Sequence, residues 1–138
     1  MRQAADIVRD QQPLSMPPAA SVRAACRAMR ERGVGAVLVV DRSGALAGIF
    51  TGRDAVCRVL AEGLDPGATT LAEVMTRDPD ATAPGCSAVE LLRRMRDGGY
   101  RHLPVVEAGR VVGIVSRGDF RGLEHARLDE ETGLWERI

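Results

Sequence analysis

The sequence has no lysine, only three cysteines and only 3% aromatic residues. The missing lysine excludes a phosphate-binding P-loop, and neither an HExxH nor a GxSxG motif is present. The cysteines (Cys26, Cys57 and Cys86) are widely spaced, so they predict free thiols in a reducing cytoplasm rather than a disulfide framework. The two histidines, His102 and His125, fall in different predicted elements and do not have metal-ligand spacing. We therefore expect neither an enzyme nor a metal site.

The chain also lacks an excess of charge and a long apolar run. Nineteen basic residues balance nineteen acidic ones, so bulk charge does not draw the protein to nucleic acid or to an anionic membrane. No apolar run approaches the roughly 20 residues that span a bilayer. The opening MRQAADIVRDQQ has no apolar segment typical of a secretory signal. These features predict a cytoplasmic protein with no membrane or nucleic-acid partner.

What the chain does contain is an internal repeat. Its two halves match in order at an offset of 66 residues, which becomes 65 after the middle of each half. GIFTGRD (48–54) returns as GIVSRGD (113–119) because the whole unit returns. We divide the chain into a first repeat (1–66), a second repeat (67–127) and a C-terminal tail (128–138). Matched pairs include Pro13 with Pro79, Ser21 with Ser87, Arg27 with Arg93, Met29 with Met95, Arg30 with Arg96, and Asp54 with Asp119.

Each repeat has the same predicted order of elements. A serine (Ser21 or Ser87) is placed to cap a helix whose apolar residues recur at helical spacing. Two short apolar runs follow, 36–40 with 45–51 and 103–106 with 111–116, joined by tight turns typical of a β-hairpin. A second helix is expected at 54–62 and at 119–127. The nearly continuous apolar strands imply a sheet buried on both faces, which one repeat cannot achieve alone.

This pattern resembles a tandem pair of CBS domains, often called a Bateman module. The residues that carry the resemblance are VMTRDP (74–79), 87–95, RHLPVV (101–106) and GIVSRGD (113–119), with weaker counterparts in the first half. The resemblance implies an α/β fold of two repeats packed with pseudo-twofold symmetry. It also implies a homodimer that binds an adenosine-type nucleotide in the cleft between the repeats and signals to a partner protein. The alternative is a constitutive dimerisation or interaction adaptor whose ligand clefts are vestigial. No cofactor is implied; the candidate ligands are AMP, ADP, ATP, S-adenosylmethionine and NADH.

The repeated hydroxyl-x-x-aspartate motif has two interpretations. Thr51 with Asp54, and Ser116 with Asp119, have the spacing of a helix capping box. The same residues at the start of a helix also suit an anion, and the carboxylate suits a vicinal diol. In proteins similar to this one, the aspartate binds ribose and the hydroxyl lies near a phosphate. We expect a nucleotide site in at least one half.

Four further residues complete the candidate site. A two-residue turn between Glu107 and Arg110 places Arg101 opposite Ser116, with His102 beside it at the mouth of the Asp119 site. Arg53 and Arg117 flank the aspartates within the motifs, where each either reaches a phosphate or is a plain surface residue. The predicted ligand-binding set is therefore Thr51, Arg53, Asp54, Arg101, His102, Ser116, Arg117 and Asp119.

Glycines and the tail leave alternatives open. Gly48 and Gly113 interrupt predicted strands. Close approach of the partner repeat is the favoured explanation for these glycines, and contact with a ligand is the alternative. The segment 33–36 is either a helix stop or an opening for a flat base. The acidic tail, with Leu134 and Trp135, is either a frayed end or a short helix that packs on a partner.

Overall fold

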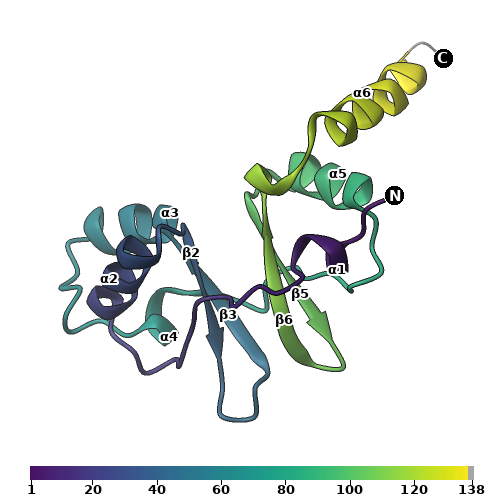
Figure 1. The fold of residues 1–138 in the computed structure, drawn as a ribbon. Helices are drawn as coiled ribbons and strands as arrows, with labels where there is room; N and C mark the ends of the chain where they lie inside the picture. Colours follow the sequence, from purple (N-terminus) through teal and green to yellow (C-terminus); the bar gives the residue numbers. More distant parts are fainter. Residues whose placement is uncertain (137–138) are drawn as a thin grey trace. The chain divides into compact units, whose positions relative to one another are not determined.

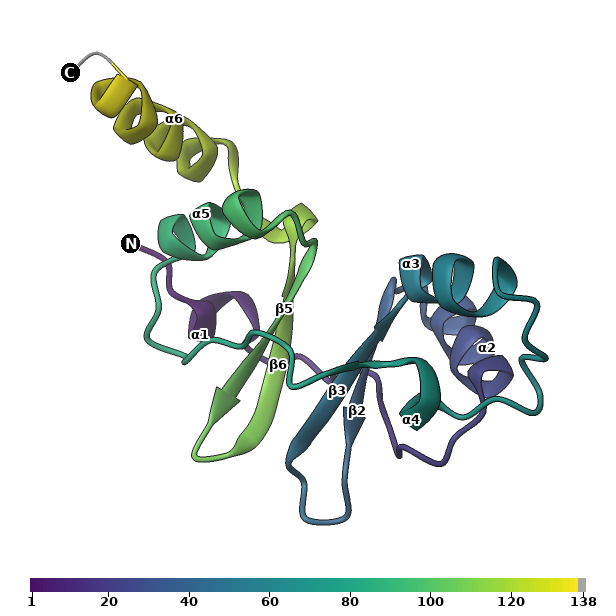
Figure 2. The same cartoon turned by 180° about the vertical axis from the view of Figure 1, so that it is seen from behind.

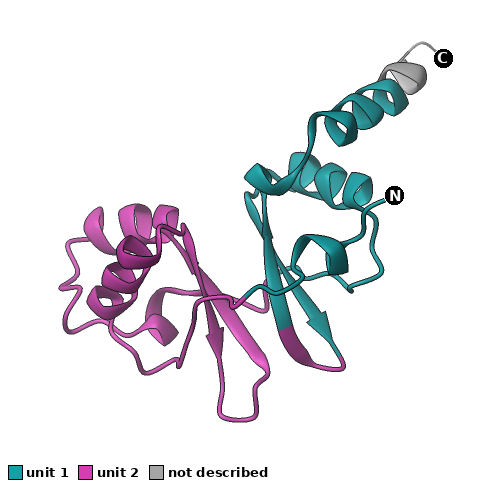
Figure 3. Ribbon diagram, viewed as in Figure 1, with its two compact units in different colours: residues 1–11, 80–107, 112–138 teal, residues 12–79, 108–111 magenta. Residues whose placement is uncertain are grey.

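A computed structural model describes the backbone of residues 1–136 and the side chains of residues 1–132. The chain forms two compact units, coloured in Figure 3. Unit 2 comprises Gln12–Pro79 with Ala108–Val111, and unit 1 comprises Met1–Gln11, Asp80–Glu107 and Val112–Ile138. Unit 2 therefore contains most of the first repeat and unit 1 most of the second. The side chains of Leu134 and Trp135, which the sequence predicts to be either frayed or packed on a partner, lie outside the described residues.

Unit 2 is a four-stranded sheet with helices packed on it (Figures 1 and 2). The strands lie in the order β1-β2-β3-β4; β1 is parallel to β2, and the other pairs are antiparallel. The elements are β1 (Ser15–Met16), α2 (Val22–Arg32), β2 (Ala36–Val40), β3 (Leu46–Thr51), the short α3 (Gly52–Asp54), the π-helical η1 (Ala55–Leu60), α4 (Leu71–Val74) and β4 (Thr76–Arg77).

Unit 1 repeats this plan with fewer strands. Its elements are α1 (Ala4–Ile7), α5 (Ala88–Gly98), the hairpin of β5 (His102–Glu107) with β6 (Arg110–Ser116), the 3₁₀ turn η2 (Arg117–Asp119) and α6 (Gly122–Glu136). Thr82 forms a parallel bridge with Val105, which corresponds to the β1–β2 pairing of unit 2. No helix of the described chain is long and apolar enough to cross a membrane.

The predicted helices and hairpins are confirmed. Ser21 caps α2 by accepting a hydrogen bond from the Ala24 amide at 3.1 Å, and Ser87 caps α5 through the Glu90 amide at 3.2 Å. Gly33 ends α2 with a positive φ of 64°, so the glycine-rich segment at 33–36 contains a helix stop. α6 begins later than predicted, at Gly122, because Phe120 is extended and separates it from η2. It also continues through the predicted tail as far as Glu136.

The compact units do not follow the repeat boundaries of the sequence, because the two repeats exchange their leading segments. Residues 1–11 of the first repeat lie in unit 1, where the Ala4 amide donates to Cys86 O at 2.8 Å. The segment 67–79 of the second repeat lies in unit 2, where β4 pairs with β3. Each core thus contains residues from both halves of the sequence, including Ala4 and Val8 in unit 1 and Leu71 and Val74 in unit 2.

The two strand glycines lie where these exchanged segments cross the hairpins. A Cβ on Gly48 would lie 2.6 Å from Met75 Sδ and 2.7 Å from Thr76 O. A Cβ on Gly113 would lie 2.5 Å from Val8 Cβ. Any side chain at these positions would overlap the segment from the other repeat, so the prediction of close approach is confirmed.

Candidate functional site

In unit 2, the candidate site is the junction where β3 ends and α3 begins. Asp54 turns back so that its Oδ2 accepts hydrogen bonds from the Thr51 amide at 2.9 Å and the Thr51 hydroxyl at 3.2 Å. The Asp54 amide donates to Thr51 Oγ1 at 3.3 Å. This is a capping box, and it fixes the carboxylate of Asp54 at the end of the strand.

Unit 1 has the same arrangement where β6 ends and η2 begins. Asp119 Oδ2 accepts from the Ser116 amide at 2.7 Å and from the Ser116 hydroxyl at 3.1 Å. The two units therefore hold a hydroxyl and a carboxylate in one geometry, as the repeated motif predicts. The capping-box interpretation is correct in both halves, and it leaves one oxygen of each carboxylate outside the box.

The two aspartates differ in the partners of their second carboxylate oxygen, Oδ1. In unit 2, Asp54 Oδ1 lies 3.5 Å from Nε of Arg58, which also donates to the main-chain oxygens of Val74 and Met75 at 3.3 and 3.2 Å. Among the side chains of residues 1–132 and the backbone of residues 1–136, Asp119 Oδ1 has no hydrogen-bond or ion-pair partner. The position that corresponds to Arg58 is Leu123, which has no charge to offer.

A different arginine supports the Asp119 turn from behind. Arg2 donates to the main-chain oxygen of Asp119 at 2.8 Å and forms an ion pair with Glu124 at 2.6 Å. This hydrogen bond from Arg2 holds the pKa of Glu124 below its usual range. Arg2 therefore fixes the backbone of the turn without using the side chain of Asp119.

Sequence reasoning missed Arg58, Arg2 and Glu124. Arg58 follows Asp54 by four residues, which is the spacing of a helical ion pair and could have indicated it. Arg2 and Glu124 are 122 residues apart, and no local pattern links them.

The strand register around Arg101 is one residue away from the prediction. The Arg117 amide donates to Arg101 O at 3.0 Å, which places Arg101 opposite Arg117 and His102 opposite Ser116. The first repeat has the same bond, from the Gly52 amide to Gly35 O at 3.1 Å, and there Ala36 pairs with Thr51. In that repeat the β2–β3 register shifts between Val39 and Val40. A register that is counted back from the hairpin turn does not include such a shift.

Among the predicted residues on β5, His102 is influenced by the charge of Asp119. It is partly buried, and burial lowers the pKa of its imidazole; the positive charge of Arg101 lowers it further, while Asp119 acts in the opposite direction. Arg101 itself is exposed. The first repeat has Gly35 and Ala36 at these positions, so only the Asp119 site has basic neighbours on this strand.

The two arginines inside the motifs differ from each other. The guanidinium of Arg117 donates to Met95 O at 3.0 Å, in the last turn of α5, where a cation complements the helix dipole. Arg53 is exposed and has no hydrogen-bond partner among the described side chains, those of residues 1–132, or the described backbone. Arg117 therefore stabilises a helix end, and Arg53 remains a free surface cation.

This arrangement offers both hydrogen-bond acceptors and donors. A fixed carboxylate with a free oxygen can accept hydrogen bonds from a diol, while a hydroxyl and nearby cations can donate to an anion. Within the described residues, no group of three or more histidine, cysteine, aspartate or glutamate side chains is arranged to hold a metal ion.

Comparison with known proteins identifies the family. The sequence profile of the CBS domain matches residues 4–60 and again residues 71–125. The CBS domain-containing protein CBSCBSPB3 of Arabidopsis thaliana is 44% identical over 102 residues, which are 74% of this chain and 18% of that protein. The chain thus spans less than a fifth of that relative.

Solved structures agree with the fold. A putative signal-transduction protein with CBS domains from Burkholderia ambifaria is 33% identical, with a TM-score of 0.79 over 85% of this chain and 89% of that one. A CBS domain protein from Pyrobaculum aerophilum, complexed with AMP, is 21% identical, with a TM-score of 0.83 over 93% of this chain and 98% of that one. At that identity the likeness concerns the fold alone. The chain belongs to the CBS domain family and carries two tandem copies of the domain.

Proposed function

We propose that the protein is a regulatory module that binds an adenosine-type nucleotide at its strand-end carboxylates and releases it unchanged. The observation that carries this proposal is the geometry of Asp119, whose Oδ2 is fixed by Ser116 while Oδ1 is free to accept from a ribose diol. CBS-domain proteins are generally regulatory, and the fold holds AMP in the Pyrobaculum protein. Both facts support the proposal.

Each predicted residue has a place in this proposal. Asp54 and Asp119 would accept from the ribose, and Thr51 and Ser116 would donate toward the phosphate. Arg101 and Arg53 would add positive charge, and His102 would donate a hydrogen bond from its neutral ring. Arg117 is engaged by Met95 O, so we give it a role at the helix end rather than at the ligand.

The ligand would act on a partner protein by favouring one conformation of the module over another. We propose a homodimer in the cytoplasm, the location favoured by three cysteines that are all free. AMP, ADP, ATP, S-adenosylmethionine and NADH are the ligands to test.

A thermal-shift panel tests the proposal. A ligand at about 100 times its dissociation constant stabilises the folded state by roughly 2.7 kcal/mol, which raises Tm visibly. We expect at least one of the five compounds to raise Tm, and chromatography to recover it unchanged after hours of incubation. If none of them shifts Tm, the protein is a constitutive interaction adaptor; if a product accumulates and is lost in Asp119→Asn, it is an enzyme.

A further inference from the structure

The Asp54 carboxylate in unit 2 has more contacts than a helix cap requires. Its Oδ2 accepts two hydrogen bonds from Thr51, which use both lone pairs of that oxygen. A diol would therefore have to bind Oδ1, and Nε of Arg58 lies 3.5 Å from this oxygen. Asp54 is also buried, whereas Asp119 is half-buried. Arg58 thus engages the acceptor that a ligand of Asp54 would need.

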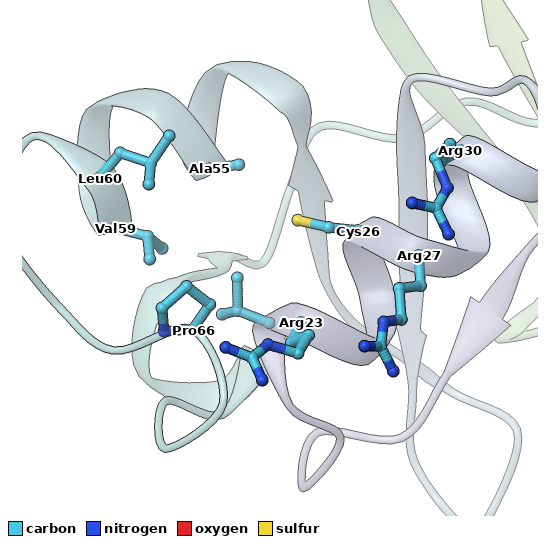
Figure 4. Close-up of a pocket in the computed structure, with 9 residues that line it drawn as sticks. Arg23, Cys26, Arg27, Arg30, Ala55, Val59, Leu60 and Pro66 are labelled. Carbon is cyan, nitrogen blue, oxygen red and sulfur yellow. The ribbon is translucent and has the colours of Figure 1, made fainter.

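Arg58 reaches this oxygen because the helix continues without a break after Asp54. Ala55 has helical backbone angles and η1 follows directly, so the residue four positions after Asp54 lies next to it. Ala55 and Val59 of η1 line a cavity of about 340 Å³ that α2 lines from the other side (Figure 4). Arg58 does not line this cavity, and its side chain extends instead toward Asp54 and toward the segment 71–77.

Two main-chain oxygens hold the guanidinium of Arg58 in place. Its Nη1 donates to Val74 O at 3.3 Å and to Met75 O at 3.2 Å. Val74 is the last residue of α4, so its carbonyl has no partner within that helix. Both residues are buried, and both belong to the segment that the second repeat contributes to unit 2. The second repeat therefore positions the arginine that pairs with the aspartate of the first.

Unit 1 has a different arrangement at Asp119. The position that corresponds to Arg58 is Leu123, whose side chain is uncharged and exposed. The backbone differs as well, because Phe120 is extended and interrupts the helix, so Leu123 does not lie one helical turn beyond Asp119. Arg2 supports this turn through Asp119 O and does not use the carboxylate. An arginine of the chain therefore engages the carboxylate of Asp54 but not that of Asp119.

We propose that Arg58 is an internal competitor that keeps nucleotide from the Asp54 site. Its guanidinium pairs with the carboxylate that a ribose diol would need, and the segment 71–77 holds it there. A diol carries no charge, so it competes poorly with a charged donor that is already in position. A movement of the segment 71–77 that draws Arg58 away would make the site available, so the second repeat regulates the site of the first. This inference rests on the proposed function, because it concerns which aspartate takes the nucleotide.

Removal of Arg58 from a chain whose other site is disabled tests the competition. The background is Asp119→Asn, the probe is AMP, and affinity is measured by isothermal titration calorimetry. We expect Asp119→Asn/Arg58→Met to bind AMP about fivefold more tightly than Asp119→Asn does, the gain from removing one half-exposed ion pair. Asp119→Asn/Arg42→Met is the matched control, because Arg42 is an exposed arginine of the same unit, and it should bind as Asp119→Asn does.

Dideoxy-AMP, which lacks both ribose hydroxyls, distinguishes competition for the carboxylate from a general effect of charge. It keeps the base and the phosphate, so its affinity for Asp119→Asn should not rise when Arg58 is replaced. Loss of a cation alone would weaken both nucleotides, because both are anions. Adding Asp54→Asn to Asp119→Asn/Arg58→Met should abolish the gain for AMP. An equal gain for both nucleotides would show that Arg58 excludes ligands by its bulk, and the proposal would be wrong.

Hydrogen exchange of the segment 71–77 tests the position of Arg58 without a nucleotide. Arg58→Met removes the donor to Val74 O and Met75 O, so amide exchange in a peptide that covers this segment should become faster, while α2 should exchange as in the wild type. Unchanged exchange of the segment would show that it does not hold Arg58, and regulation by the second repeat would be refuted.

Arg58→Gln is a second variant in case Arg58→Met does not fold. Its amide can still donate to one of the two main-chain oxygens, but it has no charge to pair with Asp54, so the gain for AMP should remain. If the wild type binds AMP and neither Arg58 variant gains affinity in the Asp119→Asn chain, the competitor proposal is wrong and the proposed function stands. If AMP binds none of these proteins and no adenosyl compound raises Tm, both proposals fail.

Discussion

The two candidate carboxylates have identical capping geometry and different neighbours. Asp54 and Asp119 each close a box with the hydroxyl residue three positions earlier. Asp54 is then partly neutralised by Arg58, whereas Asp119 keeps Oδ1 free and has His102 and Arg101 nearby. A ligand at Asp54 would have to share the carboxylate with Arg58. We therefore expect the Asp119 site to be the tighter one and to prefer phosphorylated ligands over adenosine.

His102 gives a pH dependence whose direction follows from its lowered pKa. Below the ordinary histidine pKa, the unfolded chain binds more protons at this residue than the folded chain does. The free energy of unfolding should therefore fall as the pH falls through that range. Urea denaturation at pH 7.5 and at pH 5.5 measures this loss of stability, which should be smaller in His102→Gln. An equal loss in both proteins would show that burial of His102 has no energetic consequence.

At the scale of single residues, the sequence predicted contacts between side chains that are only a few positions apart. The pairing of hydroxyl and carboxylate follows from a spacing of three, so it could be found without a structure. The partner of Arg117 is Met95 O, 22 residues earlier, and the contact of Arg2 with the Asp119 turn spans 117 residues. Such contacts depend on the tertiary fold, which is why sequence reasoning found neither the bond of Arg117 to Met95 O nor the role of Arg2.

At the scale of elements, the exchanged segments tie each compact unit to both halves of the sequence. α4 and β4 complete unit 2, and α1 completes unit 1. Periodicity found the repeat but could not show this exchange, because a repeat has the same pattern whichever neighbour it packs on. The shift in the β2–β3 register was invisible for a related reason, since an irregularity in a strand changes pairing without changing hydrophobicity.

Alanine at the strand glycines should destabilise the protein. In Gly48→Ala the new Cβ would overlap Met75 Sδ and Thr76 O, and in Gly113→Ala it would overlap Val8 and Gln11. Overpacking of this kind typically costs about 1–3 kcal/mol. Chemical denaturation should show that loss in each variant. Gly85→Ala is the control, because a Cβ there meets no atom within 4 Å, and it should stay close to wild type. Wild-type stability in Gly48→Ala would mean that β4 does not pack closely on β3.

At the scale of the whole molecule, exposed apolar side chains favour self-association. Leu123 on α6 is 82% exposed and Val56 on η1 is 57% exposed. Sedimentation equilibrium at micromolar concentration should give twice the chain mass of 14.8 kDa. Leu123→Ser should shift the equilibrium toward monomer, because it removes apolar area from the contact. A wild-type monomer at that concentration would contradict the dimer.

The architecture was the most predictable property of the molecule. The order, spacing and duplication of motifs at an offset of 66 and then 65 residues indicate two CBS domains from the sequence alone. The different lengths of the second helices were not predictable: η1 ends at Leu60, whereas its counterpart α6 continues to Glu136.

The central claim is that Asp119 binds the nucleotide through its carboxylate. Isothermal titration calorimetry with the compound that raises Tm tests it in the wild type, Asp119→Asn, Asp54→Asn and the exposed control Asp97→Asn. Asparagine keeps an oxygen for the Ser116 amide but loses the charge, so the cap survives while the charge-assisted bonds to the ligand weaken. At about 1.5–3 kcal/mol per such bond, Asp119→Asn should weaken binding roughly 10- to 150-fold, Asp54→Asn less, and Asp97→Asn not at all. Loss of the tight site in Asp54→Asn, with Asp119→Asn binding normally, would contradict this account.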